Sequence, residues 1–145
     1  MKLCTTSETI SFAKDLEEKS GEFYDVIAKR FEEAKELNIF KEENRKFVIQ
    51  IQRAYQSVIT DAIEGCFAFK LESDEYILDT DMPDGLSFSD AIKKALVIEE
   101  TISAFYDTAA DHSMSLMADI PRNFKIVSRK RIKRIEKLKS ILNMG

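Results

Sequence analysis

Apolar residues recur three and four positions apart through four long stretches of this 145-residue chain. That spacing places them on one face of an α-helix, and it is the strongest constraint that the sequence puts on the fold. With only 4 Gly and 2 Pro, the chain lacks the turns that a β-sandwich or barrel needs. Its length suits one domain. We therefore predict a single all-α domain in which each helix buries one face.

The periodic stretches set the expected helix bounds, at about residues 8–37, 41–70, 88–118 and 121–143. Ser87 or Ser89 is expected to cap the third helix, and Pro121 suits the first turn of the fourth. Residues 72–86 contain turn residues and have no helical period, which predicts a loop. Connections in the order short, long, short are typical of a four-helix bundle with one long connection between helices two and three.

Two compositional features bear on location and redox chemistry. No apolar run approaches the ~20 residues of a membrane span, and the N-terminal residues lack the apolar core of a signal peptide, so we expect a cytoplasmic protein without a membrane contact.

Cys4 and Cys66 form neither a C-x-x-C pair nor a metal-spaced set with histidine. We expect Cys66 to lie in the core.

The charge of the chain is unevenly distributed. The formal net charge is −4, yet residues 121–145 carry +8 and the preceding residues −12. The net negative charge argues against general nucleic-acid binding. Either the basic fourth helix docks on the acidic body, or it is offered to phosphate or an acidic partner. The basic residues on or beside its outer face are Arg129, Lys130, Lys133 and Lys137. Ile132 lies off the apolar stripe and indicates a second buried surface, so a homodimer is expected.

Two segments of the chain match at an offset of 82 residues. Residues 16–25 read LEEKSGEFYD, and residues 98–107 read IEETISAFYD. A repeat of this kind indicates duplicated structure. We therefore expect the first and third helices to be structural twins within two similar helix pairs.

Glu17 and Glu99 occupy equivalent places in this repeat. Glu99 follows Ala95 by four residues and precedes Ile102 by three, so it points along an apolar stripe, and Glu17 is placed in the same way. A buried ionised carboxylate costs several kcal/mol unless a cation, a metal or a set of donors meets it. Each carboxylate either reaches water at the edge of its stripe or belongs to a shared site, and the repeat favours the shared site.

The twice-occurring pattern of Leu/Ile-Glu, followed six and seven residues later by Phe-Tyr, resembles the ferritin-like proteins of the rubrerythrin and erythrin type. The similarity covers essentially the whole chain and implies a ferritin-like four-helix bundle. In that family both such glutamates bind metal, and the second and fourth helices each add a Glu-x-x-His pair. Together these residues hold two irons for oxidase or peroxidase chemistry. By this resemblance, Glu17 and Glu99 are the metal-ligand positions.

The second and fourth helices depart from the family pattern. Residues 44–60 contain no Glu, Asp or His, and Gln52 and Tyr55 stand near the expected ligand positions. In the fourth helix, Arg131 and Arg134 stand where Glu and His would be. Both Glu-x-x-His pairs are therefore missing, and two carboxylates cannot hold a di-iron pair without further protein ligands.

The remaining metal-binding residue types do not repair this site. The single histidine, His112, lies 13 residues beyond Glu99, which is roughly 20 Å along one helix. The rubredoxin-type iron site of full rubrerythrins is also missing, because it needs four paired cysteines.

Arg131 offers an alternative to metal, because it falls on the inward stripe of the fourth helix between Val127 and Ile135. We predict an ion-pair network in which its guanidinium, with that of Arg134, bridges the two glutamates by bidentate hydrogen bonds. Further hydroxyl donors to this network would be Tyr55, Tyr24 and Tyr106. The alternative is that Arg131 extends outward and packs only its methylenes.

Two functional hypotheses follow. The first is a rubrerythrin-related protein that has lost its di-iron site, binds no cofactor and acts as a non-enzymatic binding, structural or regulatory protein. The second is a divergent di-metal oxidoreductase or peroxidase in which Glu17 and Glu99 bind iron with Glu18, Glu100 or a tyrosine. Glu18 and Glu100 lie about 100° around the helix from the first pair, so we do not expect them to face the same centre.

Overall fold

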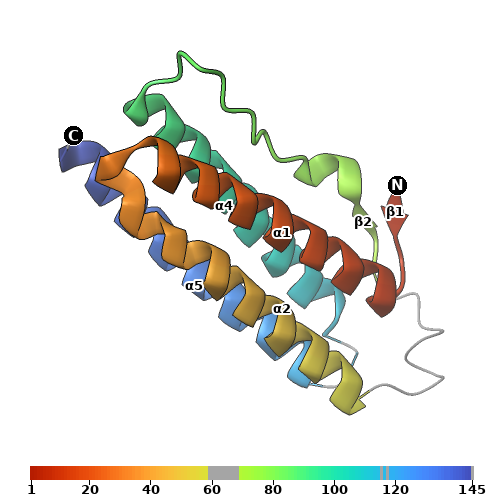
Figure 1. The fold of residues 1–145 in the computed structure, drawn as a ribbon. Helices are drawn as coiled ribbons and strands as arrows, with labels where there is room; N and C mark the ends of the chain where they lie inside the picture. Colours follow the sequence, from red (N-terminus) through yellow and green to blue (C-terminus); the bar gives the residue numbers. More distant parts are fainter. Residues whose placement is uncertain (59–68, 115, 117, 145) are drawn as a thin grey trace.

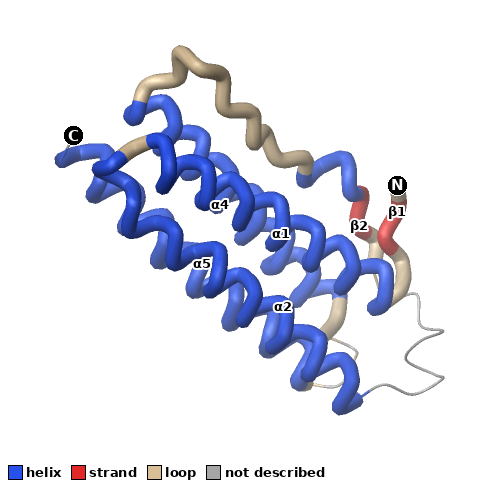
Figure 2. The backbone as a smooth tube through the Cα atoms, viewed as in Figure 1, coloured by secondary structure: helices blue, strands red, loops and turns tan. Residues whose placement is uncertain are grey.

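The computed structural model describes residues 1–58, 69–114, 116 and 118–144. Its described residues form four α-helices that lie side by side (Figures 1 and 2), with two very short strands at one end. The helices are α1 Thr6–Arg30, α2 Ile39–Val58, α4 Phe88–His112 and α5 Asp119–Met144. The predicted all-α class is confirmed. None of these helices, over the part of the chain described, is both long and apolar enough to cross a membrane.

The helices pack as two pairs, α1 with α2 and α4 with α5, and α2 also contacts α5. The apolar stripe of each helix turns inward, so one cluster of buried side chains fills the space between the pairs. Burial of such stripes is the main source of stability for helices of this kind. The core also encloses several charged residues, which are described below.

The internal repeat is visible in the structure of α1 and α4. Both helices have 25 residues, and their capping residues, Thr5 and Ser87, are separated by the same 82 positions as the matching segments. All 11 buried residues of α4 have a buried counterpart in α1 at this offset. The two helices are therefore twins in length, capping and burial, as the repeat predicted.

Helix α1 begins and ends earlier than predicted. Thr5 and Glu8 form a reciprocal capping box, in which each side chain accepts the backbone N–H of the other, so the helix begins at Thr6. It ends at Arg30, and not near residue 37, because Phe31 takes an extended backbone conformation (φ −121°, ψ 118°). The Phe31 ring packs edge-on against Phe88, with centroids 5.6 Å apart.

A 3₁₀ helix, η1 Glu32–Asn38, replaces the predicted end of the first helix. It buries Ala34 and Leu37, whose separation of three residues matches the 3₁₀ period. Helix α2 therefore begins at Ile39, slightly before the predicted bound.

The prediction of helix for residues 41–70 is wrong at its C-terminal end. Phe69 and Lys70 are not helical, and the Phe69 N–H donates to the carbonyl of Cys4 at 3.1 Å. The next residues form β2 Leu71–Glu72, which pairs antiparallel with β1 Lys2–Leu3. Residues 59–68 lie outside the described part of the chain, and with them the expected core position of Cys66.

The second helix pair departs less from its predicted bounds. Helix α4 ends at His112 instead of residue 118, and the N–H of Ser113 bonds the carbonyls of Ala109 and Ala110. Ser87, not Ser89, caps its N-terminus by accepting the N–H of Asp90 at 3.1 Å. Helix α5 begins at Asp119, so Pro121 lies in its first turn as predicted.

The segment before α4 runs along the outside of the helices (Figure 1). It starts with a 3₁₀ turn that was not predicted, η2 Ser73–Tyr76, and residues 77–87 have no helix or strand. The Arg30 guanidinium donates to the carbonyls of Met82 and Pro83 at 2.9 and 2.8 Å. This last residue of α1 therefore ties the segment to the helices.

Candidate functional site

Glu17 and Glu99 face the space between the helix pairs, from α1 and α4 respectively. Their side chains are 1% and 0% exposed, even though each lies beside an exposed glutamate, Glu18 or Glu100. The apolar periodicity of each helix therefore carries the glutamate inward together with the leucine or isoleucine before it. Two carboxylates buried to this extent need compensating charge.

Arg131 of α5 supplies that charge. Its side chain is completely buried, and it is the largest of the fully buried side chains in the described structure. Nη1 donates to Oε1 of Glu99 at 2.6 Å, and Nη2 donates to both carboxylate oxygens of Glu17. One guanidinium thus bridges the two repeat-related glutamates, in the fork geometry that suits arginine better than lysine. The outward position of Arg131 that the sequence left open does not occur.

Arg134, one turn further along α5, extends the network to α2. Its Nη1 donates to Oε1 of Glu99 at 3.3 Å, and its Nη2 donates to Oε1 of Glu43 at 3.0 Å. The guanidinium carbon also lies 4.3 Å from the ring centroid of Phe40, within the range of a cation–π contact. The network therefore contains two guanidinium groups and three carboxylates.

Glu43 was missed in the sequence, although a signal was available. It precedes Phe47 by four residues and so stands at the edge of the apolar stripe of α2. Its carboxylate is 39% exposed, so it has one side toward water and one toward Arg134. A charged residue at such an edge stays partly hydrated, so it loses little solvation free energy when it pairs with a buried partner.

The tyrosines differ in their relation to the network. Tyr24 donates from its hydroxyl to Oε1 of Glu99 at 2.8 Å. Tyr106 is its repeat partner and is equally buried, but its hydroxyl has no hydrogen-bond partner within the described chain. Tyr55 lies on α2, partly buried and packed against the core, and its membership of the network stays a prediction.

Two further buried polar atoms of the network have no hydrogen-bond partner among the described residues, Oε2 of Glu99 and Nε of Arg131. Oε1 of Glu99, by contrast, accepts from three donors. The hydrogen bonding of the network is therefore concentrated on Glu17 and on one oxygen of Glu99. Unpaired buried polar atoms of this kind carry a desolvation cost.

The electrostatics of the site follow from burial and proximity. Burial raises the pKa of Glu17 above its ordinary value, although the charge of Arg131 opposes this shift. Burial alone would lower the pKa of Arg131, but the charges of Glu17 and Glu99 raise it above its ordinary value, so the guanidinium stays protonated. Burial, with the nearby carboxylates, also raises the pKa values of Tyr24 and Tyr106 well above the ordinary value. Both phenols therefore remain neutral, and the Tyr24 hydroxyl keeps the proton that it donates to Glu99.

This donor set does not fit a di-iron centre. Three of the four carboxylate oxygens of Glu17 and Glu99 already accept guanidinium or phenol hydrogen bonds, and a metal between them would meet the positive charge of Arg131. The other ligands considered for a divergent site, Glu18 and Glu100, are exposed. Over residues 1–58, 69–114, 116 and 118–144, no three His, Cys, Asp or Glu side chains are grouped as a metal site would require.

The remaining residues of interest lie away from the network. His112 ends α4, and its Nδ1 accepts the backbone N–H of Lys70 at 3.1 Å. Cys4 is a partly buried free thiol. The outer basic residues of α5 do face outward: Arg129, Lys130 and Lys133 are exposed, whereas Lys137 is partly covered and lies 4.0 Å from Glu36.

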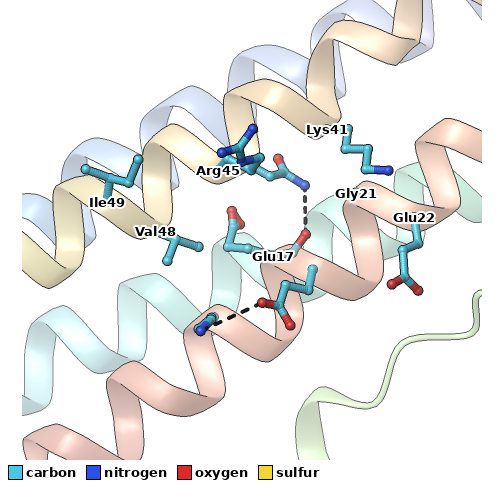
Figure 3. Close-up of a pocket in the computed structure, with 10 residues that line it drawn as sticks. Glu17, Gly21, Glu22, Lys41, Arg45, Val48 and Ile49 are labelled. Carbon is cyan, nitrogen blue, oxygen red and sulfur yellow. Dashed lines mark hydrogen bonds and ion pairs between the residues drawn. The ribbon is translucent and has the colours of Figure 1, made fainter.

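A surface pocket of about 370 Å³ lies between α1 and α2, on the outer side of Glu17. Figure 3 shows Glu17, Gly21 and Glu22 of α1 on one side and Lys41, Arg45, Val48 and Ile49 of α2 on the other. A Cβ atom at Gly21 would lie 3.4 Å from Cγ of Lys41, so the two helices are in close contact at this point.

The cations at the rim of this pocket already have partners. Lys14, Lys41 and Arg45 lie within 4.0 Å of Glu18, Asp25 and Glu42, respectively. Because these cations are compensated, and Glu22 adds a carboxylate to the lining, the pocket has no excess positive charge with which to recruit an anionic ligand.

Comparisons of the chain with protein-family models, with curated proteins and with solved structures found no match. The function is therefore inferred from the fold and from the buried network. Together they define an all-helical protein whose core encloses an arginine–glutamate network.

Proposed function

We propose that this chain is a cytoplasmic, ferritin-like protein related to the rubrerythrins, in which an arginine replaces the di-iron site. It acts as a non-enzymatic binding, structural or regulatory protein. The observation that carries this proposal is the position of the Arg131 guanidinium, which is completely buried between Glu17 and Glu99 and bonded to both.

The physical reason for this proposal is the way in which the charge of the two buried carboxylates is compensated. In a rubrerythrin-type site, carboxylates on the first and third helices are neutralised by metal, and here a guanidinium compensates the carboxylates at the same positions of the repeat. An arginine is protonated at every physiological pH and, unlike a metal, offers no open coordination position at which dioxygen or peroxide could react. The duplicated α1 and α4, each with one such glutamate, also support a ferritin-like ancestry.

Metal analysis of the purified protein tests this proposal. The protein is produced in iron-supplemented medium, freed of loosely bound metal by gel filtration and measured by elemental mass spectrometry. We expect iron far below one atom per chain, and no peroxide or dioxygen turnover above buffer. Two tightly held irons per chain, or turnover that is lost in Glu99→Ala, would instead support the divergent oxidoreductase.

We also propose that the protein is a homodimer. Ile132 on α5 is 43% exposed and Val97 on α4 is 59% exposed, so the packed α4–α5 pair presents large apolar side chains to its surroundings. Sedimentation equilibrium is expected to give twice the chain mass for the natural sequence and a shift toward monomer for Ile132→Asp. A natural protein that sediments as a monomer at all concentrations would overturn the dimer.

A further inference from the structure

A second surface depression, of about 550 Å³, lies beside the contact between α2 and α5. We call it the basic groove and define it by Lys46, Ile49, Gln50, Arg53 and Ser57 of α2 and Asn123 of α5. These two helices lie next to each other in Figure 1. The groove is on a different side of α2 from the α1–α2 pocket near Glu17, although Ile49 borders both.

The cations of the basic groove lack acidic partners. Within the described residues, neither Lys46 nor Arg53 makes an ion pair, and Lys130, whose ammonium lies 5.7 Å from the Phe47 ring centroid of α2, makes none either. The nearby acids of α2 are already engaged, Glu42 by Arg45 and Glu43 by Arg134. The groove and its α5 border therefore carry uncompensated positive charge.

The cations of the basic groove differ in this respect from the lysines of α1. The exposed lysines of α1 each have a carboxylate within 4.0 Å, in the pairs Lys14–Glu18, Lys19–Asp15 and Lys29–Asp25. In a chain with a net charge of −4, three cations that make no ion pair among the described residues, Lys46, Arg53 and Lys130, lie where α2 and α5 meet. Lys2 and Lys93, which also make none there, lie apart from each other on β1 and α4. A local field of this sign attracts anionic groups and speeds their association.

We propose that the basic groove is a docking site for a short acidic segment of a protein partner. Lys46 and Arg53 are seven residues apart on one helix, about 10 Å along its axis, so they can meet two carboxylates on an extended or helical peptide. Between them, the Gln50 and Asn123 amides are joined by a 2.7 Å hydrogen bond and present groups of the kind that bond a peptide backbone. Ile49, which is 43% exposed at the rim, offers an apolar contact.

A protein segment fits this groove better than a nucleic acid does. No aromatic side chain lines the described groove on which a base could stack, and stacking is a main source of single-strand affinity. The first 120 residues also carry a net charge of −12, which repels a long polyanion that extends beyond the groove. A short acidic segment avoids this repulsion. This inference rests on the proposed role as a binding protein and names the class of partner.

Fluorescence anisotropy with a labelled oligoglutamate peptide that contains interspersed leucines tests the inference on the full chain. We expect saturable binding that weakens as salt is raised, and a Kd at least about tenfold higher in the Lys46→Glu/Arg53→Glu double variant. The matched control is Lys2→Glu/Lys93→Glu, which changes the net charge equally at two exposed lysines on β1 and α4. It is expected to retain most of the affinity.

Three outcomes would overturn the docking site. They are the absence of saturable binding, an equal loss in both double variants, and tighter binding of a labelled single-stranded DNA than of the peptide. Circular dichroism melting of each variant establishes that it is folded, and Lys46→Ala/Arg53→Ala, which removes charge without adding acid, provides a second test if the reversed variant unfolds. The metal content of the protein is independent of these results, so failure here leaves the arginine-for-iron proposal standing, and the reverse also holds.

Discussion

Nη1 of Arg131 lies 2.6 Å from Oε1 of Glu99, and neither side chain has any exposure to solvent. The same guanidinium reaches Glu17, so helices α1, α4 and α5 meet at one buried cation. Burying such groups costs several kcal/mol each, which their attraction offsets only with good geometry and further hydrogen bonds. We therefore expect the intact network to add little net stability compared with well-packed apolar side chains of similar size.

Removal of the cation is expected to be strongly destabilising. Arg131→Met leaves Glu17 and Glu99 buried without their shared partner, so the free energy of unfolding should fall by about 3–5 kcal/mol. Urea denaturation followed by circular dichroism measures the loss. Arg129→Met is the matched control, because Arg129 is exposed on the same helix, and its effect should stay within about 0.5 kcal/mol. Equal effects of the two changes would contradict the buried role of Arg131.

Removal of Arg131 together with both of its carboxylate partners should cost less than removal of Arg131 alone. In the triple variant Glu17→Leu/Glu99→Leu/Arg131→Met no carboxylate of the pair is left unpaired, and apolar side chains of similar size often replace buried ion pairs without loss. We expect the triple variant to be more stable than Arg131→Met alone in the same urea experiment. A triple variant less stable than the single one would contradict the expectation that the unpaired carboxylates are the main cost of Arg131→Met.

The two repeat-related tyrosines provide a matched pair of changes. Tyr24→Phe removes a hydrogen bond to a charged acceptor, worth about 1.5–3 kcal/mol. Tyr106→Phe removes a hydroxyl that is buried without a partner in the described structure, so it should be neutral or slightly stabilising. Thermal and urea unfolding of both variants measures the difference. Equal losses would show that the Tyr106 hydroxyl also has a partner in solution.

The raised pKa of Glu17 predicts a particular pH dependence. An acid whose pKa is higher in the folded than in the unfolded chain binds more protons when folded, so its contribution to the free energy of unfolding falls as pH rises above the ordinary value of 4.5. Arg131 does not alter this slope, because arginine is protonated in the unfolded chain throughout this window and its pKa is raised further in the folded chain. The difference in stability between the natural protein and Glu17→Gln should therefore decrease from pH 4.5 toward neutrality.

Urea titrations at a series of pH values measure that difference. Glu18→Gln is the matched control, because Glu18 is the exposed neighbour of Glu17 on the same helix, and it should show no such trend. A difference that instead increases with pH would mean that pairing with Arg131 outweighs burial and depresses the pKa of Glu17.

Periodicity alone predicted much of the fold. The class, the four helices and the twin relation of α1 to α4 follow from apolar spacing and from the repeat. The helix ends were harder to predict, because they depend on contacts with distant parts of the chain. Phe31 leaves the helix to pack against Phe88, and Phe69 bonds to Cys4 beside a strand pair whose two members are nearly 70 residues apart in sequence.

The site was predictable to the extent that it lies on strongly periodic helices. Glu17, Glu99 and Arg131 each interrupt an apolar stripe, and the need for charge compensation connects them. Apolar spacing places Glu43 at the edge of a stripe, but it does not reveal the pairing of Glu43 with Arg134 or the uncompensated charge of Lys46 and Arg53. Whether a charge on the edge of a helix is paired depends on which helix lies beside it, and apolar spacing does not encode the order of the helices.

The most direct test of whether Arg131 or iron lies between Glu17 and Glu99 is a crystal structure at atomic resolution. Anomalous diffraction would be recorded at the iron edge from crystals grown with ferrous iron. We predict continuous density for the Arg131 guanidinium within hydrogen-bond distance of both Glu17 and Glu99, and no anomalous peak between them. An anomalous peak bound by the two carboxylates, with Arg131 turned away, would contradict this prediction.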